Sequence, residues 1–108
     1  MKVISDKDKG ARLQALADAE ARQWEKDFCK VMSTREGRHV LWKILEFTGP
    51  MRDAFKGNSE TFYLQGRQSV GKFLYGEVDR LCFEMYVEAR AEAIERQLNF
   101  ELEEKSHG

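Results

Sequence analysis

The stretch from Gly66 to Phe73 reads GRQSVGKF, and its first seven residues match the opening of a phosphate-binding loop, G-x-x-x-x-G-K. In such a loop the lysine contacts the phosphates, and the Ser or Thr that follows holds Mg²⁺ through its hydroxyl. Phe73 stands where that hydroxyl should be. The residues before the loop are expected to be helical, whereas a phosphate loop follows a buried strand of a parallel sheet. The pattern therefore predicts a helix in which Gly66, Ser69 and Gly71 admit the close approach of another helix or loop.

The other reactive side chains form no recognisable catalytic or metal-binding set. Neither of the two histidines, His39 and His107, is tied by spacing to a Ser or Cys nucleophile. A row of glutamates on the last predicted helix has no His three or four residues away, as a di-metal bundle would require: Glu84, Glu88, Glu92 and Glu95. Cys29 and Cys82 lack metal-ligand spacing and are expected to be buried, reduced thiols, as suits a reducing cytosol. The sequence predicts a protein that is not an enzyme and holds no cofactor or metal.

Length and composition indicate one helical domain. The chain has 108 residues, with 42% apolar residues, 34% charged residues and a single proline, Pro50. These values are typical of a soluble protein rich in long helices. No stretch approaches the length of a membrane span, and the N-terminus lacks the apolar segment of a signal peptide. We expect a single domain over residues 1–108, with 1–9 and 105–108 flexible.

A long amphipathic helix is predicted from about Asp8 to near Ser33. Its apolar residues recur at three- and four-residue steps and so share one face: Leu13, Leu16, Ala17, Ala21, Trp24, Phe28, Val31 and Met32. Ser33 and Glu36 have the S-x-x-E spacing of a capping box, which predicts the start of a second helix. Gly49 and Pro50 should end that helix, because glycine adopts the left-handed cap and proline cannot continue it.

After a connection over residues 50–58, Asn58 or Ser59 should cap a third helix, with Glu60 near its positive end. The predicted inner face of that helix is Phe62, Gly66, Val70, Phe73, Leu74, Val78 and Leu81. A kink or restart is expected near Cys82. The last helix should bury Phe83, Val87, Ala91, Ile94, Leu98 and Leu102, expose Glu88, Glu92, Glu95 and Arg96, and fray after Glu104. The expected fold is all-α, with about four amphipathic helices in a small bundle and long helices at both ends.

Charge is segregated along a chain whose net charge is −1. Residues 30–76 carry eight basic and four acidic side chains, whereas residues 77–108 carry four basic and nine acidic ones. We expect the two segments to pack together and neutralise each other; the alternative is that they are two separate partner surfaces. Basic residues around the second helix favour nucleic acid: Lys30, Arg35, Arg38 and Lys43. The neutral chain lacks the positive excess of nucleic-acid-binding domains, so nucleic acid is disfavoured as a partner.

The middle of the chain is rich in large apolar residues, more than one small core can take: Trp42, Phe47, Met51, Phe55, Phe62, Tyr63, Phe73 and Tyr75. Some are expected to form an exposed patch that meets a partner. The alternative is that the connection over residues 50–58 folds back and buries them.

Several short motifs together resemble a known family. They are Gly37-Arg38, Leu41-Trp42, Leu45-Glu46, Gly49, Phe55, Gly57-Asn58-Ser59-Glu60, Gly66-Arg67 and Gly71. With these motifs, roughly residues 28–80 resemble a family of small proteins encoded by short-tailed bacteriophages (podoviruses), named after a Bordetella phage gene product. The resemblance implies a phage origin and a helical fold, and it brings no catalytic residue. Members sit among particle and DNA-packaging genes, which implies a virion or assembly role.

The resulting hypothesis is a non-catalytic virion or virion-assembly protein that acts through helix-mediated contacts. The expected partners are other virion proteins, of the portal, tail or ejection apparatus, or further copies of the chain, in the host cytoplasm during assembly and in the virion. The candidate contact residues are Trp42, Phe55, Asn58, Glu60 and Arg67, although Asn58 and Glu60 also suit helix capping. The alternative is an early phage regulator that binds nucleic acid or a host protein.

Overall fold

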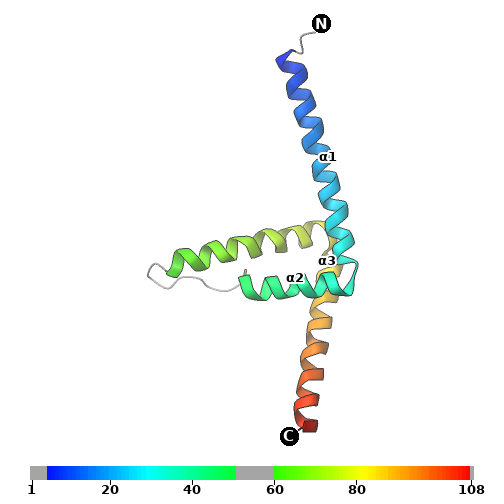
Figure 1. Ribbon diagram of the computed structural model, residues 1–108, viewed down its shortest axis with the longest axis vertical. Coiled ribbons are helices and arrows are strands. Elements are labelled where there is room, and N and C mark those ends of the chain that lie inside the picture. Colours follow the sequence, from blue (N-terminus) through cyan, green and yellow to red (C-terminus); the bar gives the residue numbers. More distant parts are fainter. Residues whose placement is uncertain (1–4, 51–59, 108) are drawn as a thin grey trace.

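The computed structural model describes residues 5–50 and 60–107, and within these ranges every regular element is a helix. Helix α1 spans Asp6–Met32, α2 spans Arg35–Thr48 and α3 spans Glu60–His107. In Figure 1, α2 and the first part of α3 run side by side, while α1 and the last part of α3 project in opposite directions. The molecule measures 79 × 39 × 20 Å. The all-α prediction is confirmed, but the small bundle is wrong, because both terminal arms extend beyond the packed region.

The described residues form three helices rather than about four, because the last two predicted helices form one helix with a kink. At Cys82 the backbone leaves the helical region, with φ −160° and ψ 58°. The kink predicted at this position is therefore confirmed. Helical geometry resumes after that residue, so α3 changes direction at Cys82 and continues to His107, beyond the predicted fraying point at Glu104.

The ends of the helices follow local capping chemistry. The hydroxyl of Ser5 accepts a hydrogen bond from the N–H of Asp8, and α1 begins at Asp6, two residues earlier than predicted. At the end of α2, Gly49 has φ 53° and ψ 55°, which confirms the predicted left-handed cap. The predicted connection and the caps at Asn58 or Ser59 lie outside the described residues.

The capping box predicted from Ser33 is wrong by one residue. Ser33 keeps helical backbone angles and closes α1, because its N–H donates to the carbonyl of Cys29. Thr34 is the first extended residue, and its hydroxyl accepts from the N–H of Gly37 at 3.0 Å. Thr34 is therefore the N-cap of α2.

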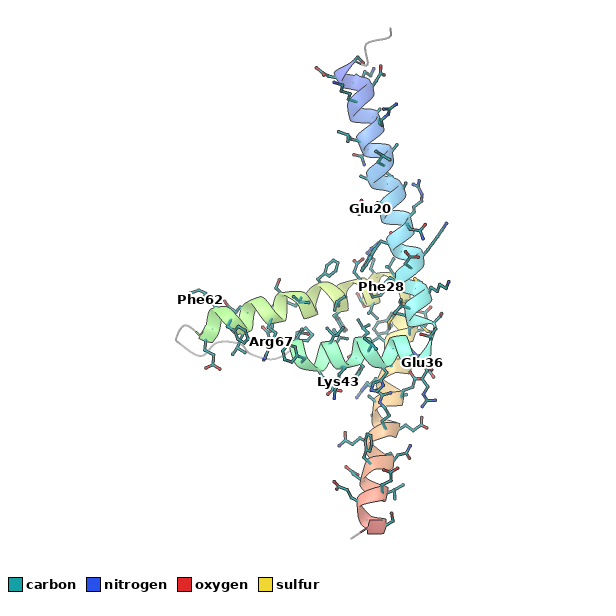
Figure 2. All side chains as sticks on the ribbon, in the orientation of Figure 1. Glu20, Phe28, Glu36, Lys43, Phe62 and Arg67 are labelled. Atoms are coloured by element: carbon teal, nitrogen blue, oxygen red, sulfur yellow. The ribbon has the colours of Figure 1, made fainter. Side chains whose placement is uncertain are left out.

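The core lies where the three helices meet. It combines the end of α1, the middle of α2 and the residues around the kink of α3: Phe28, Met32, Leu41, Leu45, Val78 and Cys82. Figure 2 shows Phe28 at this junction. On α1 only Phe28 and Met32 are buried, whereas Leu13 and Leu16 are more than 60% exposed. The apolar face predicted for α1 thus joins the core only at its C-terminal end, because the rest of the helix extends past α2 and α3.

The buried face of the first part of α3 differs from the predicted stripe. Phe62, Val70 and Phe73 are exposed, while Thr61, Gln68 and Gly71 are buried and continue toward Val78 and Cys82 at helical spacing. For Gln68 and Gly71 the reason is the close packing of α2 against this part of α3.

A Cβ atom at Gly71 would overlap the side chain of Thr48, so glycine is required for the approach of the two helices. The side chain of Gln68 donates to the carbonyl of Gly49 at 2.6 Å, at the C-terminal end of α2. The prediction that Gly71 admits another helix is confirmed. It is wrong for Ser69, which is exposed, and at Gly66 no described residue would lie within 4 Å of an added Cβ.

Candidate interaction surfaces

A buried ion pair joins α2 to the last part of α3. The guanidinium of Arg38 donates from Nε to Oε1 of Glu92 at 2.7 Å and from a terminal nitrogen to Oε2 at 3.0 Å. The same guanidinium donates to the carbonyl of Met32, at the end of α1. Glu92 is only 5% exposed, which corrects the prediction that it faces solvent. Arg38 thus connects all three helices through charge-assisted hydrogen bonds.

The electrostatics of this pair are those of a structural contact. Hydrogen bonding from Arg38 lowers the pKa of Glu92, and the positive charge of Arg35 acts in the same direction. The hydrogen bond to Glu92 in turn raises the pKa of Arg38. Arg35 lies 3.6 Å from Glu92 and 3.3 Å from Glu95. The expectation that the basic middle and the acidic C-terminal segment neutralise each other is confirmed at this contact.

A second polar cluster joins α1 to α3 on the other side of the core. The indole of Trp24 donates to Glu77 at 2.6 Å, and Arg80 bridges Glu77 and Glu25 at 2.8 and 3.0 Å. Hydrogen bonds from Arg80 and Trp24 lower the pKa of Glu77. This carboxylate therefore serves to hold α1 against α3.

The two cysteines come together between α1 and the kink of α3. The thiol of Cys29 donates to the carbonyl of Leu81 at 3.9 Å, and Cys82 is buried. Burial raises the pKa of the Cys82 thiol to about 11, and the neighbouring Cys29 adds to that rise. Both thiols are free, Cys29 being partly buried. The raised pKa disfavours the reactive thiolate at Cys82.

The predicted contact residue Trp42 is half-buried in an aromatic cluster. Its ring lies 5.8 Å from that of Tyr86, which packs edge-on against Tyr75 at 5.3 Å. These side chains line a cavity of about 180 Å³ near the end of α2, together with Leu45, Glu46, Gly49 and Pro50. Much of the Trp42 side chain is therefore buried in the contact between α2 and α3.

Arg67, the second predicted contact residue within the described range, lies between two aromatic rings. Its guanidinium carbon is 4.8 Å from the ring centre of Phe47 and 5.7 Å from that of Tyr63, which are distances for cation–π contact. Figure 2 shows Arg67 on the part of α3 that runs beside α2. Its Nε is buried without a hydrogen-bond partner among the described residues.

Of the remaining three candidates, the structure describes Glu60. Glu60 is exposed in the first turn of α3, where its charge suits the positive helix end. Phe55 and Asn58 lie outside the described residues. Among the described candidates, the structure places Trp42 in the aromatic cluster and Arg67 between Phe47 and Tyr63.

Exposed apolar side chains, by contrast, form continuous faces on all three helices. On α2, Val40, Ile44 and Phe47 follow one another at helical spacing and are 62%, 38% and 62% exposed. They line an open groove of about 880 Å³ with Lys43, Glu46 and His39, the last of which is exposed. The last part of α3 carries a longer face, from Phe83 to Leu102, with five large side chains that are between 47% and 63% exposed. Sequence periodicity finds the residues of this longer face on α3 but assigns them to a core.

The described residues also bear on metal binding and on crossing a membrane. They hold no group of three or more His, Cys, Asp or Glu side chains placed to bind a metal ion. Among the same residues, no helix is both long enough and apolar enough to cross a membrane.

The described residues thus form an extended helical scaffold with internal ion pairs and exposed apolar faces. The family model for Bbp19-like phage protein matches residues 28–94. That range is more than half of the chain, and the chain belongs to this family of phage proteins. The match begins at Phe28, the first core residue, and extends past the region of residues 28–80 recognised in the sequence. Neither the comparison with curated proteins nor that with solved structures found a match.

Proposed function

We propose that the protein is a non-catalytic component of the phage virion or of its assembly, and that it acts by binding other phage proteins through its exposed helical faces. Support comes first from membership of the Bbp19-like phage protein family. The observation that carries the proposal is the extent of exposed apolar surface on helices that project from the core, such as Leu98 at 54% and Leu102 at 63%. Exposed apolar faces of this extent are typical of surfaces that a partner covers.

The non-catalytic part of the proposal rests on how the perturbed carboxylates are used. Groups with shifted pKa values often mark catalytic sites. Here the lowered pKa values belong to Glu92 and Glu77, and each follows from an arginine that ties two helices together. Their shifts are accounted for by structural ion pairs.

The alternative, a regulator that binds nucleic acid, has less support than the sequence suggested. Its basis was the basic residues around the second helix. Arg38 is engaged with the buried Glu92, and Arg35 lies against Glu92 and Glu95. Two of the four cations are therefore already paired with carboxylates of the same chain.

The proposal predicts that purified mature particles contain the protein in fixed proportion to the major capsid protein. Components of portals, tails and ejection machinery occupy symmetric positions, so the copy number should be a simple multiple of the particle symmetry. Quantitative mass spectrometry of purified particles, with isotope-labelled peptides from both proteins, measures this ratio. Partly assembled particles should be measured alongside them, because an assembly factor would be present there in fixed proportion and absent from mature particles. Absence from both would contradict the proposal.

A further inference from the structure

In the described structure, the last part of α3 packs one face against the core and exposes the opposite face. Met85, Ala89 and Glu92 turn toward α2 and the core, and all three are partly or fully buried. At about 100° of rotation per residue, the exposed apolar residues lie roughly 160° around the helix from this packed face. They are Phe83, Val87, Ala91, Ile94, Leu98 and Leu102. These six residues form the outer stripe.

The outer stripe has the regularity of a helix–helix contact. Phe83, Val87 and Ala91 are followed by Ile94, Leu98 and Leu102 at the same three- and four-residue steps, so the pattern repeats after eleven residues. A repeat of this length stays nearly parallel to the helix axis, because it corresponds to about 3.67 residues per turn. The stripe is about 28 Å long at 1.5 Å per residue. A second helix could therefore lie along its whole length.

The charges beside the outer stripe specify the partner. Residues 83–107 carry seven acidic and three basic side chains, a net charge of −4. Along one edge of the stripe lie Glu84, Glu88 and Glu95, the last of which pairs with Arg35 of α2, and along the other lie Arg90 and Glu101. Both edges therefore carry exposed carboxylates. Charged residues that flank an apolar helix seam set the choice of partner.

These flanks disfavour a second copy of the chain. Antiparallel pairing of two outer stripes would place the edge with Glu84 and Glu88 against the same edge of the other copy. Parallel pairing would set that edge against one with a single cation, Arg90, and a further glutamate, Glu101. Like charges facing each other across a helix seam are destabilising. The same charges disfavour an anionic lipid surface.

We propose that the outer stripe is the docking site for an amphipathic helix of another protein, with an apolar seam flanked by Lys or Arg. This inference deepens the proposed function, since it names the kind of partner that a virion or assembly protein of this type would bind. The apolar side chains would supply affinity, and the acidic edges would select a basic helix over an acidic one.

The test uses the full chain and two synthetic helical peptides with the same apolar seam, one flanked by lysines and the other by glutamates. Fluorescence anisotropy should show that the lysine-flanked peptide binds and the glutamate-flanked one does not. Raising the salt concentration should weaken binding, because exposed charges are screened. Leu98→Ser should weaken it about tenfold, since a buried leucine contributes at least that much.

Phe100→Ser is the matched control. Phe100 is two residues from Leu98 on the same helix, is 65% exposed and points away from the outer stripe. Binding should change less than about twofold in this variant. Circular dichroism should show equal helix content in both variants, because neither side chain is in the core.

Four results would overturn the inference: no binding of the lysine-flanked peptide, equal binding of both peptides, a dimer of the chain that Leu98→Ser dissociates, or binding to anionic vesicles that Leu98→Ser abolishes. Failure here leaves the particle measurement untouched. If the protein occurs in particles and the peptide does not bind, only this inference fails. If the peptide binds at Leu98 and the protein is absent from both particle preparations, only the proposed function fails.

Discussion

At the residue scale, Arg38 and Glu92 form the contact on which the arrangement of the three helices depends. Arg38 also donates to the Met32 carbonyl, so one guanidinium holds the end of α1, the start of α2 and the last part of α3. Because Glu92 is almost fully buried, it needs the arginine to remain charged there. Loss of either partner leaves the other buried charge without compensation.

Glu92→Gln is therefore predicted to destabilise the protein by roughly 1–3 kcal/mol at neutral pH, the cost of weakening charge-assisted hydrogen bonds in a buried site. The pKa of Glu92 is lowered below its ordinary value of 4.5 in the folded protein. Its contribution is thus fully present above pH 4.5 and is lost as the pH falls through the lowered pKa. Urea unfolding followed by circular dichroism should show stability falling below pH 4.5, and less steeply in the variant.

Glu95→Gln is the control for this prediction. Glu95 also pairs with an arginine, Arg35, but its side chain is 60% exposed. A surface ion pair contributes at most about 1 kcal/mol. Equal losses in the two variants would show that the burial of Glu92 has no energetic consequence.

At the element scale, the contact between α2 and α3 depends on a residue without a side chain. Gly71→Ala would bring a Cβ into the side chain of Thr48 and close to Pro50. The two helices would have to separate, and the expected loss is about 1–3 kcal/mol in the free energy of unfolding. Gly66→Ala, five residues earlier on the same helix, meets no described residue within 4 Å. It should instead stabilise the protein by roughly 0.5–1 kcal/mol, because alanine favours a helix interior. Thermal unfolding of both variants should show changes in stability of opposite sign. Stabilisation by Gly71→Ala would contradict the close approach of α2 and α3.

The same elements show how far sequence reasoning reaches. The helical class, the end of α2 at Gly49 and the kink near Cys82 follow from local signals, and all three are observed. The faces of α3 do not follow, because periodicity weighs apolar character and the buried positions here include Thr61, Gln68 and Glu92. Gln68 donates a hydrogen bond to Gly49 and Glu92 forms an ion pair with Arg38, and both contacts involve a distant part of the chain.

The candidate site shows the same limit. Trp42 and Arg67 were selected for their chemistry, and each is in contact with aromatic side chains of the α2–α3 pair. The exposed stripe from Phe83 to Leu102 was identified as a set but assigned to a core. Whether an apolar face is covered depends on where neighbouring helices end, and α2 does not extend along that side of α3. The periodicity of apolar residues within one helix does not show where the neighbouring helices end.

At the scale of the whole molecule, the projecting arms set the dimensions of the protein. Its radius of gyration is 20.4 Å, whereas a compact chain of this length would have about 13 Å. Small-angle X-ray scattering at low protein concentration should therefore give a radius near that of the extended form for a particle with the mass of one chain, 12.6 kDa. In the extended form the acidic end of α3 and the mixed charges of α1 are exposed to solvent. A monomer with a radius near the compact value would mean that the outer stripe is covered by the chain itself. It would remove the physical basis for a docking face, since a stripe packed against α1 is no longer available to a partner helix.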